Sequence, residues 1–169
     1  MSDPLSIALV RSAGDRRLYE LDGVGSLRLN GWLMRSATVR TADATFTVRK
    51  ARWNATVVAV DAAGTQIGLH RPHALRGGGT LTWHGVEHEL RHDALLAERY
   101  ALVDHGRLLA EVTAKGWWGW GSRKPVELTV HERTDPGLLL FAAFVVRTRS
   151  SDAAAVSAAT TSSTGAYSG

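Results

Sequence analysis

The fold of this chain is decided by one stretch near its C-terminus: Asp135-Pro136-Gly137-Leu138-Leu139-Leu140-Phe141-Ala142-Ala143-Phe144-Val145-Val146-Arg147-Thr148-Arg149. Its first residues favour the start of a helix, because aspartate caps helix N-termini and proline suits the first helical turn. The two arginines at the far end would complement the helix dipole. Residues 138–146 are apolar on every face, so a helix formed here must be buried all round.

A central strand is the alternative for this stretch, because Phe141, Val145 and Val146 favour strands. A membrane span does not fit, since the apolar run covers about 14 Å as a helix and a bilayer span needs about 20 apolar residues. The Asp-Pro start and the leucine and alanine content favour the helix. We therefore predict a buried hydrophobic helix over about residues 135–149.

Most of the remaining chain has the pattern of short strands joined by tight turns. Three hairpins are centred on Gly64, on His84-Gly85 and on Gly106, each between apolar segments. Glycine, and histidine more readily than most other residues, adopts the left-handed backbone that such turns need. Hairpins without a long repeat indicate a meander that closes on itself. The predicted fold is mainly β, a closed antiparallel β-barrel around the C-terminal helix.

The composition places these elements in one domain. A length of 169 residues, with 44% apolar and 21% charged residues, suits one globular core. We expect an N-terminal arm over residues 1–14, the barrel with its central helix over 15–150, and a disordered Ser/Ala/Thr-rich tail over 151–169. The chain has no cysteine, and its first residues lack the features of a signal peptide. We therefore expect a cytoplasmic protein.

Three segments and a pair of hairpins carry a family resemblance. The segments are Gly116-Trp117-Trp118-Gly119, Pro125-Val126-Glu127-Leu128-Thr129-Val130 and 135–146, and the two hairpins turn after Val60-Asp61 and Val103-Asp104. In these features the chain resembles the tubby C-terminal-like superfamily, which includes tubby-like, phospholipid scramblase and LURP-one-related proteins. It looks like an uncharacterised bacterial branch, similar over roughly residues 15–150. The resemblance implies a closed β-barrel wrapped around a hydrophobic C-terminal helix.

The resemblance implies less about function. Tubby-like members bind phosphoinositides through basic surface residues, and scramblases are associated with lipid movement and carry cysteine-rich lipidation sites. This chain has no cysteine, so the lipid anchor does not carry over, and no phosphoinositide-binding motif matches. The resemblance therefore supports the fold more than any activity.

The segment His88-Glu89-Leu90-Arg91-His92 matches the His-Glu-x-x-His pattern of zinc proteases. That chemistry needs a helix, because on a strand the two histidines would lie about 13 Å apart, too far for zinc bonds of about 2 Å. The preceding turn and the alternation over 86–91 favour a strand, although residues 87–100 contain neither glycine nor proline and could form a helix. We predict no metal and no cofactor, and we retain a small zinc-dependent hydrolase using His88, Glu89 and His92 as an alternative.

The glycine-rich segment 115–125 combines indoles with cations. Its candidate binding residues are Lys115, Trp117, Trp118, Trp120, Arg123 and Lys124. Tryptophan favours the membrane interface, and lysine and arginine attract anionic head groups. Tryptophan with arginine could equally stack on nucleic-acid bases. The structural alternative is that the indoles fold back and close one end of the barrel.

The charge pattern narrows the choice of partner. The net charge is +4, but the arginines are scattered along the chain, and a nucleic-acid footprint requires clustering. We predict no specific nucleic acid and a non-enzymatic binding module, which contacts anionic lipid or a phosphate-bearing partner through the loop from Lys115 to Lys124. This places the protein in the cytoplasm or at the periphery of a membrane. A protein-interaction domain is a further alternative, and the oligomeric state does not follow from the sequence.

Overall fold

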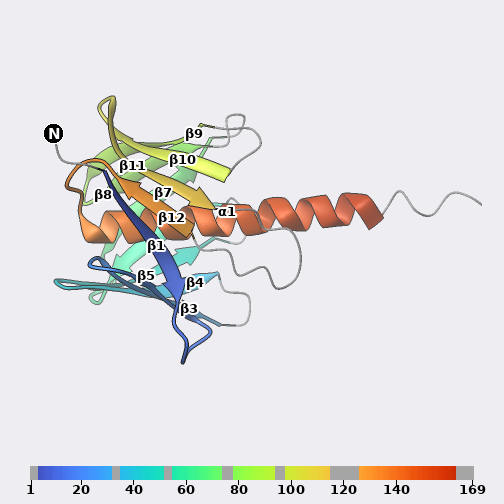
Figure 1. Cartoon of the computed structure of the whole chain (residues 1–169), viewed down its shortest axis with the longest axis horizontal. Coiled ribbons are helices and arrows are strands. Elements are labelled where there is room, and N and C mark those ends of the chain that lie inside the picture. Colours follow the sequence, from blue (N-terminus) through green and yellow to red (C-terminus); the bar gives the residue numbers. More distant parts are fainter. Residues whose placement is uncertain are drawn as a thin grey trace, which may run out of the picture.

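The computed structural model describes residues 4–31, 35–51, 55–73, 78–93, 98–114 and 126–162; of residue 98 and of residues 150–162 it describes the backbone. Within these ranges the chain forms twelve strands and one helix (Figure 1). The strands are β1 Leu5–Arg11, β2 Leu18–Leu21, β3 Gly25–Asn30, β4 Ser36–Thr41, β5 Thr45–Lys50, β6 Val57–Asp61, β7 Gln66–Pro72, β8 Gly79–Trp83, β9 Val86–His92, β10 Glu98–Asp104, β11 Arg107–Ala114 and β12 Val126–Val130. The helix is α1 Pro136–Ser162.

The strands close into an antiparallel barrel. Each strand pairs with its neighbours in the sequence, and β1 pairs with β12, with Leu5 opposite Val130 and Leu9 opposite Val126. The predicted closed antiparallel β-barrel is therefore confirmed. The N-terminal arm predicted over residues 1–14 is corrected for residues 5–11, which form β1. Leucine and isoleucine alternate with smaller or polar residues there, which is a strand pattern, and this strand supplies the edge that β12 needs to close the barrel.

The three hairpins predicted from the sequence join β6 to β7, β8 to β9 and β10 to β11. His84-Gly85 and His105-Gly106 have positive φ at both residues, with values of 47° and 81° in the first pair and 46° and 84° in the second. Two positive φ angles in succession are the signature of the type I′ turn, whose twist matches that of the flanking strands. Gly64 likewise has a φ of 84°.

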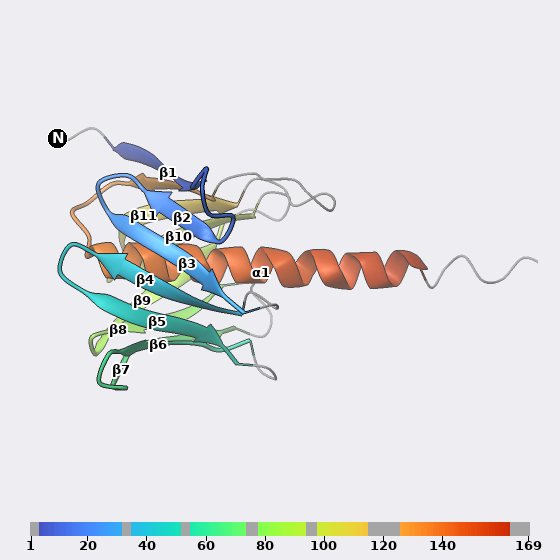
Figure 2. The same ribbon diagram turned by 90° about the horizontal axis from the view of Figure 1, so that it is seen from below.

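Helix α1 begins at a side-chain cap and then passes through the barrel. The Asp135 carboxylate accepts hydrogen bonds from the backbone N–H groups of Gly137, at 2.7 Å, and Leu138, at 3.1 Å. From residue 138 to residue 146 every side chain is at most 3% exposed. A helix buried on all its faces must have structure on all sides, and both views show α1 enclosed by the strands along this length (Figures 1 and 2). The predicted buried helix is confirmed.

The helix continues beyond the barrel to Ser162, as Figure 2 shows on the right of the barrel. The disordered tail predicted over residues 151–169 is therefore corrected for residues 151–162, which are helical. Alanine has the highest helix propensity, and extending an existing helix avoids the unfavourable nucleation step. The weak hydrophobicity of this segment led to the wrong prediction, although helix extension does not require a core.

Aromatic rings fill the space around the first turns of α1. The ring of Trp83 stacks on Phe141, with 5.5 Å between centroids, and meets the edge of Phe46 at 5.2 Å. Gly137 allows this approach, because a Cβ atom there would lie 2.7 Å from the Trp83 ring. The apolar run of the helix and the inward-facing residues of the strands thus form one continuous core.

The two ends of the barrel differ. At one end, which we call the turn end, lie the tight turns of the β8–β9 and β10–β11 hairpins and the entry into α1. At the other, the helix-exit end, α1 leaves the barrel (Figure 2). Because neighbouring strands are antiparallel, β3, β5, β7, β9 and β11 all end at the helix-exit end, at Asn30, Lys50, Pro72, His92 and Ala114. The connections that start there are longer in sequence than the two-residue turns.

Replacing Phe141 with aspartate should lower the free energy of unfolding by about 3–5 kcal/mol, because an unpaired charge would be enclosed by the core. This is a large part of the about 5–15 kcal/mol that stabilises a small domain. Urea denaturation measures the change. Val10→Asp is the matched control, since Val10 is 57% exposed, and it should change stability by less than about 0.5 kcal/mol. An unchanged midpoint for the Phe141 variant would contradict the enclosed helix.

Candidate functional site

Two cations lie side by side at the helix-exit end. Lys50 ends β5, and its backbone N–H donates to the carbonyl of Arg35, just before β4, at 2.8 Å. The β4–β5 register pairs Ser36 with Arg49, so Arg35 and Lys50 are opposite one another and share a face of the sheet. Strand alternation puts Lys50 on the same face as Val48, which is fully buried. The two cations therefore stand at the mouth of the barrel.

A third cation reaches this mouth from the helix. Arg149 is half-buried, and its Nη1 atom donates to the carbonyl of Gly78 at 2.7 Å. Burial lowers the pKa of Lys50 from its ordinary value, and the nearby charges of Arg35 and Arg149 lower it further. In the part of the chain that the structure describes, no carboxylate lies within ion-pair distance of Arg35 or Arg149. The three side chains thus form a region of concentrated positive charge.

A buried imidazole lies in the same cross-strand row. Lys50 pairs with Val57, and Val57 pairs with His70. His70 is fully buried, and neither ring nitrogen has a hydrogen-bond partner in the described residues. Burial lowers the pKa of His70 to about 3, with a further contribution from the charge of Arg149. The imidazole is therefore neutral at pH 7. A Cβ atom on Gly79 would lie 2.4 Å from its Nε2 atom, so glycine is needed opposite it.

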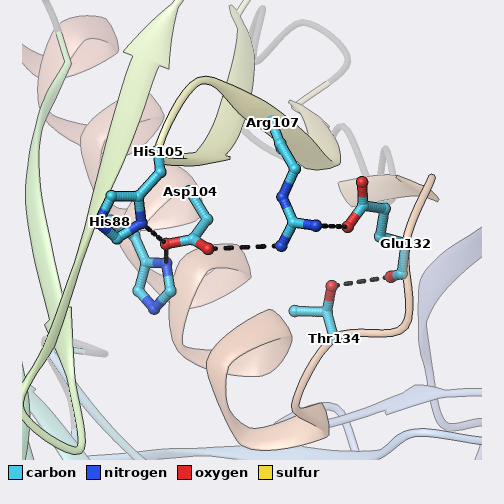
Figure 3. A network of polar contacts seen from close by, with 6 residues as sticks. All are labelled: His88, Asp104, His105, Arg107, Glu132 and Thr134. Carbon is cyan, nitrogen blue, oxygen red and sulfur yellow. Dashed lines mark hydrogen bonds and ion pairs between the residues drawn. The ribbon is translucent and has the colours of Figure 1, made fainter.

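A second polar cluster lies at the turn end of the barrel (Figure 3). The Asp104 carboxylate is approached by the Nδ1 atom of His105 at 2.9 Å and by that of His88 at 3.4 Å. Arg107 bridges Asp104, at 3.8 Å, and Glu132, at 3.7 Å. We call these five residues the Asp104 network.

The Asp104 network holds structural elements together. It joins β9 and the β10–β11 hairpin to the segment that leads into α1 (Figure 3). Burial lowers the pKa of His88, while the charge of Asp104 acts in the opposite direction. His88 thus remains an uncharged neighbour of the carboxylate near neutral pH. Among the described residues no group of three or more His, Cys, Asp or Glu side chains is arranged to hold a metal ion.

The His-Glu-x-x-His segment is a strand. Residues Val86–His92 form β9, as the turn and the alternation predicted. His88 faces the interior and is 9% exposed, whereas Glu89 is exposed on the opposite face. In this geometry His92 lies four positions after His88 along the strand, about 13 Å away, so one zinc ion cannot bind both. The structure removes the geometry on which the hydrolase alternative depended.

The binding residues predicted from the sequence lie outside the described residues. These are Lys115, Trp117, Trp118, Trp120, Arg123 and Lys124. The strand ends that flank this segment are described, and Ala114 pairs with Val126 at the helix-exit end. The segment therefore starts and finishes at the same end of the barrel as Arg35, Lys50 and Arg149.

Sequence reasoning missed the three clustered cations. Arg149 was interpreted as complementing a helix terminus at about residue 149, but the helix continues past it, and the side chain meets Gly78 instead. Lys50 had a detectable signal in the sequence. Polar and apolar residues alternate over Thr45-Phe46-Thr47-Val48-Arg49, and Lys50 is the next residue on the face of Phe46 and Val48. The meeting of β4, β5 and α1 at one place depends on barrel closure, which no local pattern encodes.

No family model, no curated protein and no solved structure matches the chain.

The unfolding free energy should fall by about 2 kcal/mol between pH 7.5 and pH 5 through His70 alone. Its folded pKa is about 3, below the unfolded value of about 6.5, so the unfolded state binds the proton first and stability is lost as the pH falls through this window. Urea denaturation at several pH values measures the loss.

His70→Leu should remove that component of the pH dependence and should be no less stable than the parent at pH 7.5, because it replaces an unsatisfied polar ring with an apolar side chain. His84→Asn is the control. His84 is exposed at a positive φ, which asparagine also adopts, so its pH profile should match the parent's. A His70→Leu profile as steep as the parent's would contradict the assignment of the pH dependence to His70.

We expect the purified protein, prepared without a chelator and without a histidine tag, to contain no stoichiometric zinc. The reason is the strand geometry of β9, which separates His88 from His92. Elemental analysis of the full chain measures the content. Stoichiometric zinc that is lost in His88→Ala, and kept in His84→Asn, would restore the hydrolase as the leading candidate.

Proposed function

We propose that this protein is a non-enzymatic binding module that attaches to a phosphate-bearing anionic surface, foremost anionic lipid, through the helix-exit end of its barrel. The observation that carries this proposal is the convergence of Arg35, Lys50 and Arg149 at that end. Two of these cations have no carboxylate partner in the described residues. Each cation near an anionic membrane contributes about 1 kcal/mol, so such a cluster gives attachment that depends on salt.

The sequences of the connections at this end support the same proposal. The segments between β3 and β4, between β5 and β6, and between β11 and β12 contain five of the six tryptophans, namely Trp32, Trp53, Trp117, Trp118 and Trp120. Tryptophan is enriched at membrane–water interfaces. The proposed binding residues Lys115, Arg123 and Lys124 belong to the last of these connections. Three cations alone would give only weak binding to an anionic membrane, and inserted indoles would strengthen it.

The helix constrains how such a surface could approach. Residues 150–162 of α1 extend about 20 Å beyond Arg149, from the same end of the barrel (Figure 2). A flat surface therefore reaches the cluster best on the β4–β5 side, with the barrel axis inclined to it. No helix within the described residues has the length and apolar character needed to span a bilayer. We propose peripheral attachment of a cytoplasmic protein.

The tubby C-terminal-like superfamily fits this proposal at the level of architecture. The closed antiparallel barrel and the buried C-terminal helix agree with what the sequence resemblance implied. We propose membership of that superfamily on these two features and on the residues quoted above. A protein-interaction domain is the remaining alternative. It would use the same end of the barrel, without dependence on lipid charge.

Sedimentation of the full chain with vesicles tests the proposal. At low salt the protein should sediment with vesicles containing anionic lipid and remain in solution with neutral vesicles, and raising the salt should release it because screening weakens exposed charges. Arg123→Glu combined with Lys124→Glu should reduce the bound fraction. Arg40→Glu, an exposed charge reversal near the turn end, is the matched control and should bind like the parent. Equal sedimentation with both vesicle types would contradict lipid attachment and favour a protein partner.

A further inference from the structure

We propose that Arg35, Lys50 and Arg149 form a discrete site for one phosphate monoester at the mouth of the barrel. The inference rests on the proposed function and adds the chemical class of the recognised group. A phosphate monoester carries about 1.5 to 2 negative charges at pH 7, whereas a phosphodiester carries one. The same chemistry occurs in a soluble phosphate compound and in a lipid with a monoester head group.

The site is built by three separate elements. Arg35 lies just before β4, Lys50 ends β5 and Arg149 belongs to α1. The backbone bond between Lys50 and Arg35 fixes the first two relative to each other, and the bond from Arg149 to the Gly78 carbonyl holds the third. Arginine has five N–H donors in a planar fork that matches phosphate oxygens. One bond to Gly78 leaves donors for a ligand.

Charge balance selects the monoester. Like charges at directly opposite positions of a sheet are destabilising, and Arg35 and Lys50 occupy such positions, with Arg149 close enough to lower the pKa of Lys50 further. In the described part of the chain, no carboxylate lies within ion-pair distance of Arg35 or Arg149 to offset its charge. A dianion would offset the charges of both arginines, while a phosphodiester would offset only one of them. The larger relief of repulsion favours the more highly charged ligand.

His70 lies close enough to Arg149 to report on a ligand bound there. Its Nε2 atom faces Gly79, and Arg149 binds the carbonyl of Gly78, so both side chains meet the same two-glycine segment. A fully buried imidazole with two unpartnered nitrogens is costly. The charge of Arg149 lowers the pKa of His70, and an anion bound to Arg149 would offset this effect. The His70 ring should therefore report binding, although it is not itself exposed to solvent.

Titration of the full chain with methyl phosphate and with dimethyl phosphate, by calorimetry and by NMR of the histidine rings, tests the inference. At pH 7.5 and low salt, methyl phosphate should bind with one-to-one stoichiometry, at least about tenfold more tightly than dimethyl phosphate. It should also shift the His70 resonances. Binding should weaken as the pH falls below about 6, where a monoester takes up its second proton. Equal affinity for the two compounds, or no binding of methyl phosphate, would overturn the inference.

Three variants separate the site from general surface charge. Arg35→Gln and Arg149→Gln should each weaken methyl phosphate binding about tenfold. Arg35 is exposed, so its variant should fold like the parent even if the Arg149 variant is less stable. Arg49→Gln is the matched control, because Arg49 is exposed on the opposite face of β5 beside Lys50, and it should bind like the parent. An equal loss in the Arg49 variant would overturn the inference.

Vesicles distinguish the source of the phosphate and separate this inference from the proposed function. Phosphatidic acid carries a monoester and phosphatidylglycerol a diester, so preferential binding to phosphatidic acid vesicles, lost in Arg35→Gln, would support a lipid source. Charge-dependent binding to both vesicle types, without binding of methyl phosphate, would leave surface attachment standing and overturn the monoester site. Binding of methyl phosphate without attachment to any vesicle would support the site, assign it to a soluble phosphate compound and contradict lipid attachment.

Discussion

The rest of the structure depends on the burial of one helix on all its faces. From Leu138 to Val146 no side chain can face water without cost, and a single sheet can cover only one face of a helix. A closed sheet supplies apolar contacts all round, and the twelve-strand barrel does this with inward-facing residues from strands around its circumference. At about 25 cal/mol for each Å² of apolar surface removed from water, burial of this run of leucine, phenylalanine, alanine and valine stabilises the fold. The barrel covers the apolar surface of the helix, and the helix covers the apolar inner face of the barrel.

Threading a helix through a barrel also makes the two ends of the molecule unequal. The chain enters the interior from the turn end, where the Asp104 network ties the β10–β11 hairpin to the segment before α1. It leaves at the helix-exit end, where the strand connections are longer. At that end polar side chains of the helix meet the inner faces of the strands for the first time, and Arg149 does so beside Lys50. A cluster of charge at the exit is thus a consequence of where the apolar run stops.

The charged groups at the two ends of the barrel follow different patterns. At the turn end, the Asp104 carboxylate forms an ion pair with Arg107 and lies beside His88 and His105. At the helix-exit end, the cations repel one another. Among the described residues, buried polar atoms without a hydrogen-bond partner occur at both ends, in His70 at the helix-exit end and in Trp83 and His88 near the turn end. Natural sequences break local rules, such as the pairing of opposite charges, most often where a site needs it. This contrast between the two ends, rather than the net charge of the chain, directs attention to the exit end.

The sequence by itself determined the elements whose signals are local. The apolar run with its Asp135 cap favoured a buried helix over a central strand, the glycine and histidine turns indicated the hairpins, and the alternation over 86–91 favoured a strand over a zinc-binding helix, although the sequence left that last choice open. Two predictions were wrong. Residues 5–11 were assigned to an N-terminal arm but form a strand, whose pairing with β12 exists only when the barrel closes. Residues 151–162 were assigned to a disordered tail but are helical, because an alanine-rich helix can extend without a core. The tertiary structure alone decided that Arg35, Lys50, His70 and Arg149 lie at the same end of the barrel. These residues are far apart in the chain, and their proximity follows from strand order, register and the length of helix inside the barrel, which are set by the packing of the whole core.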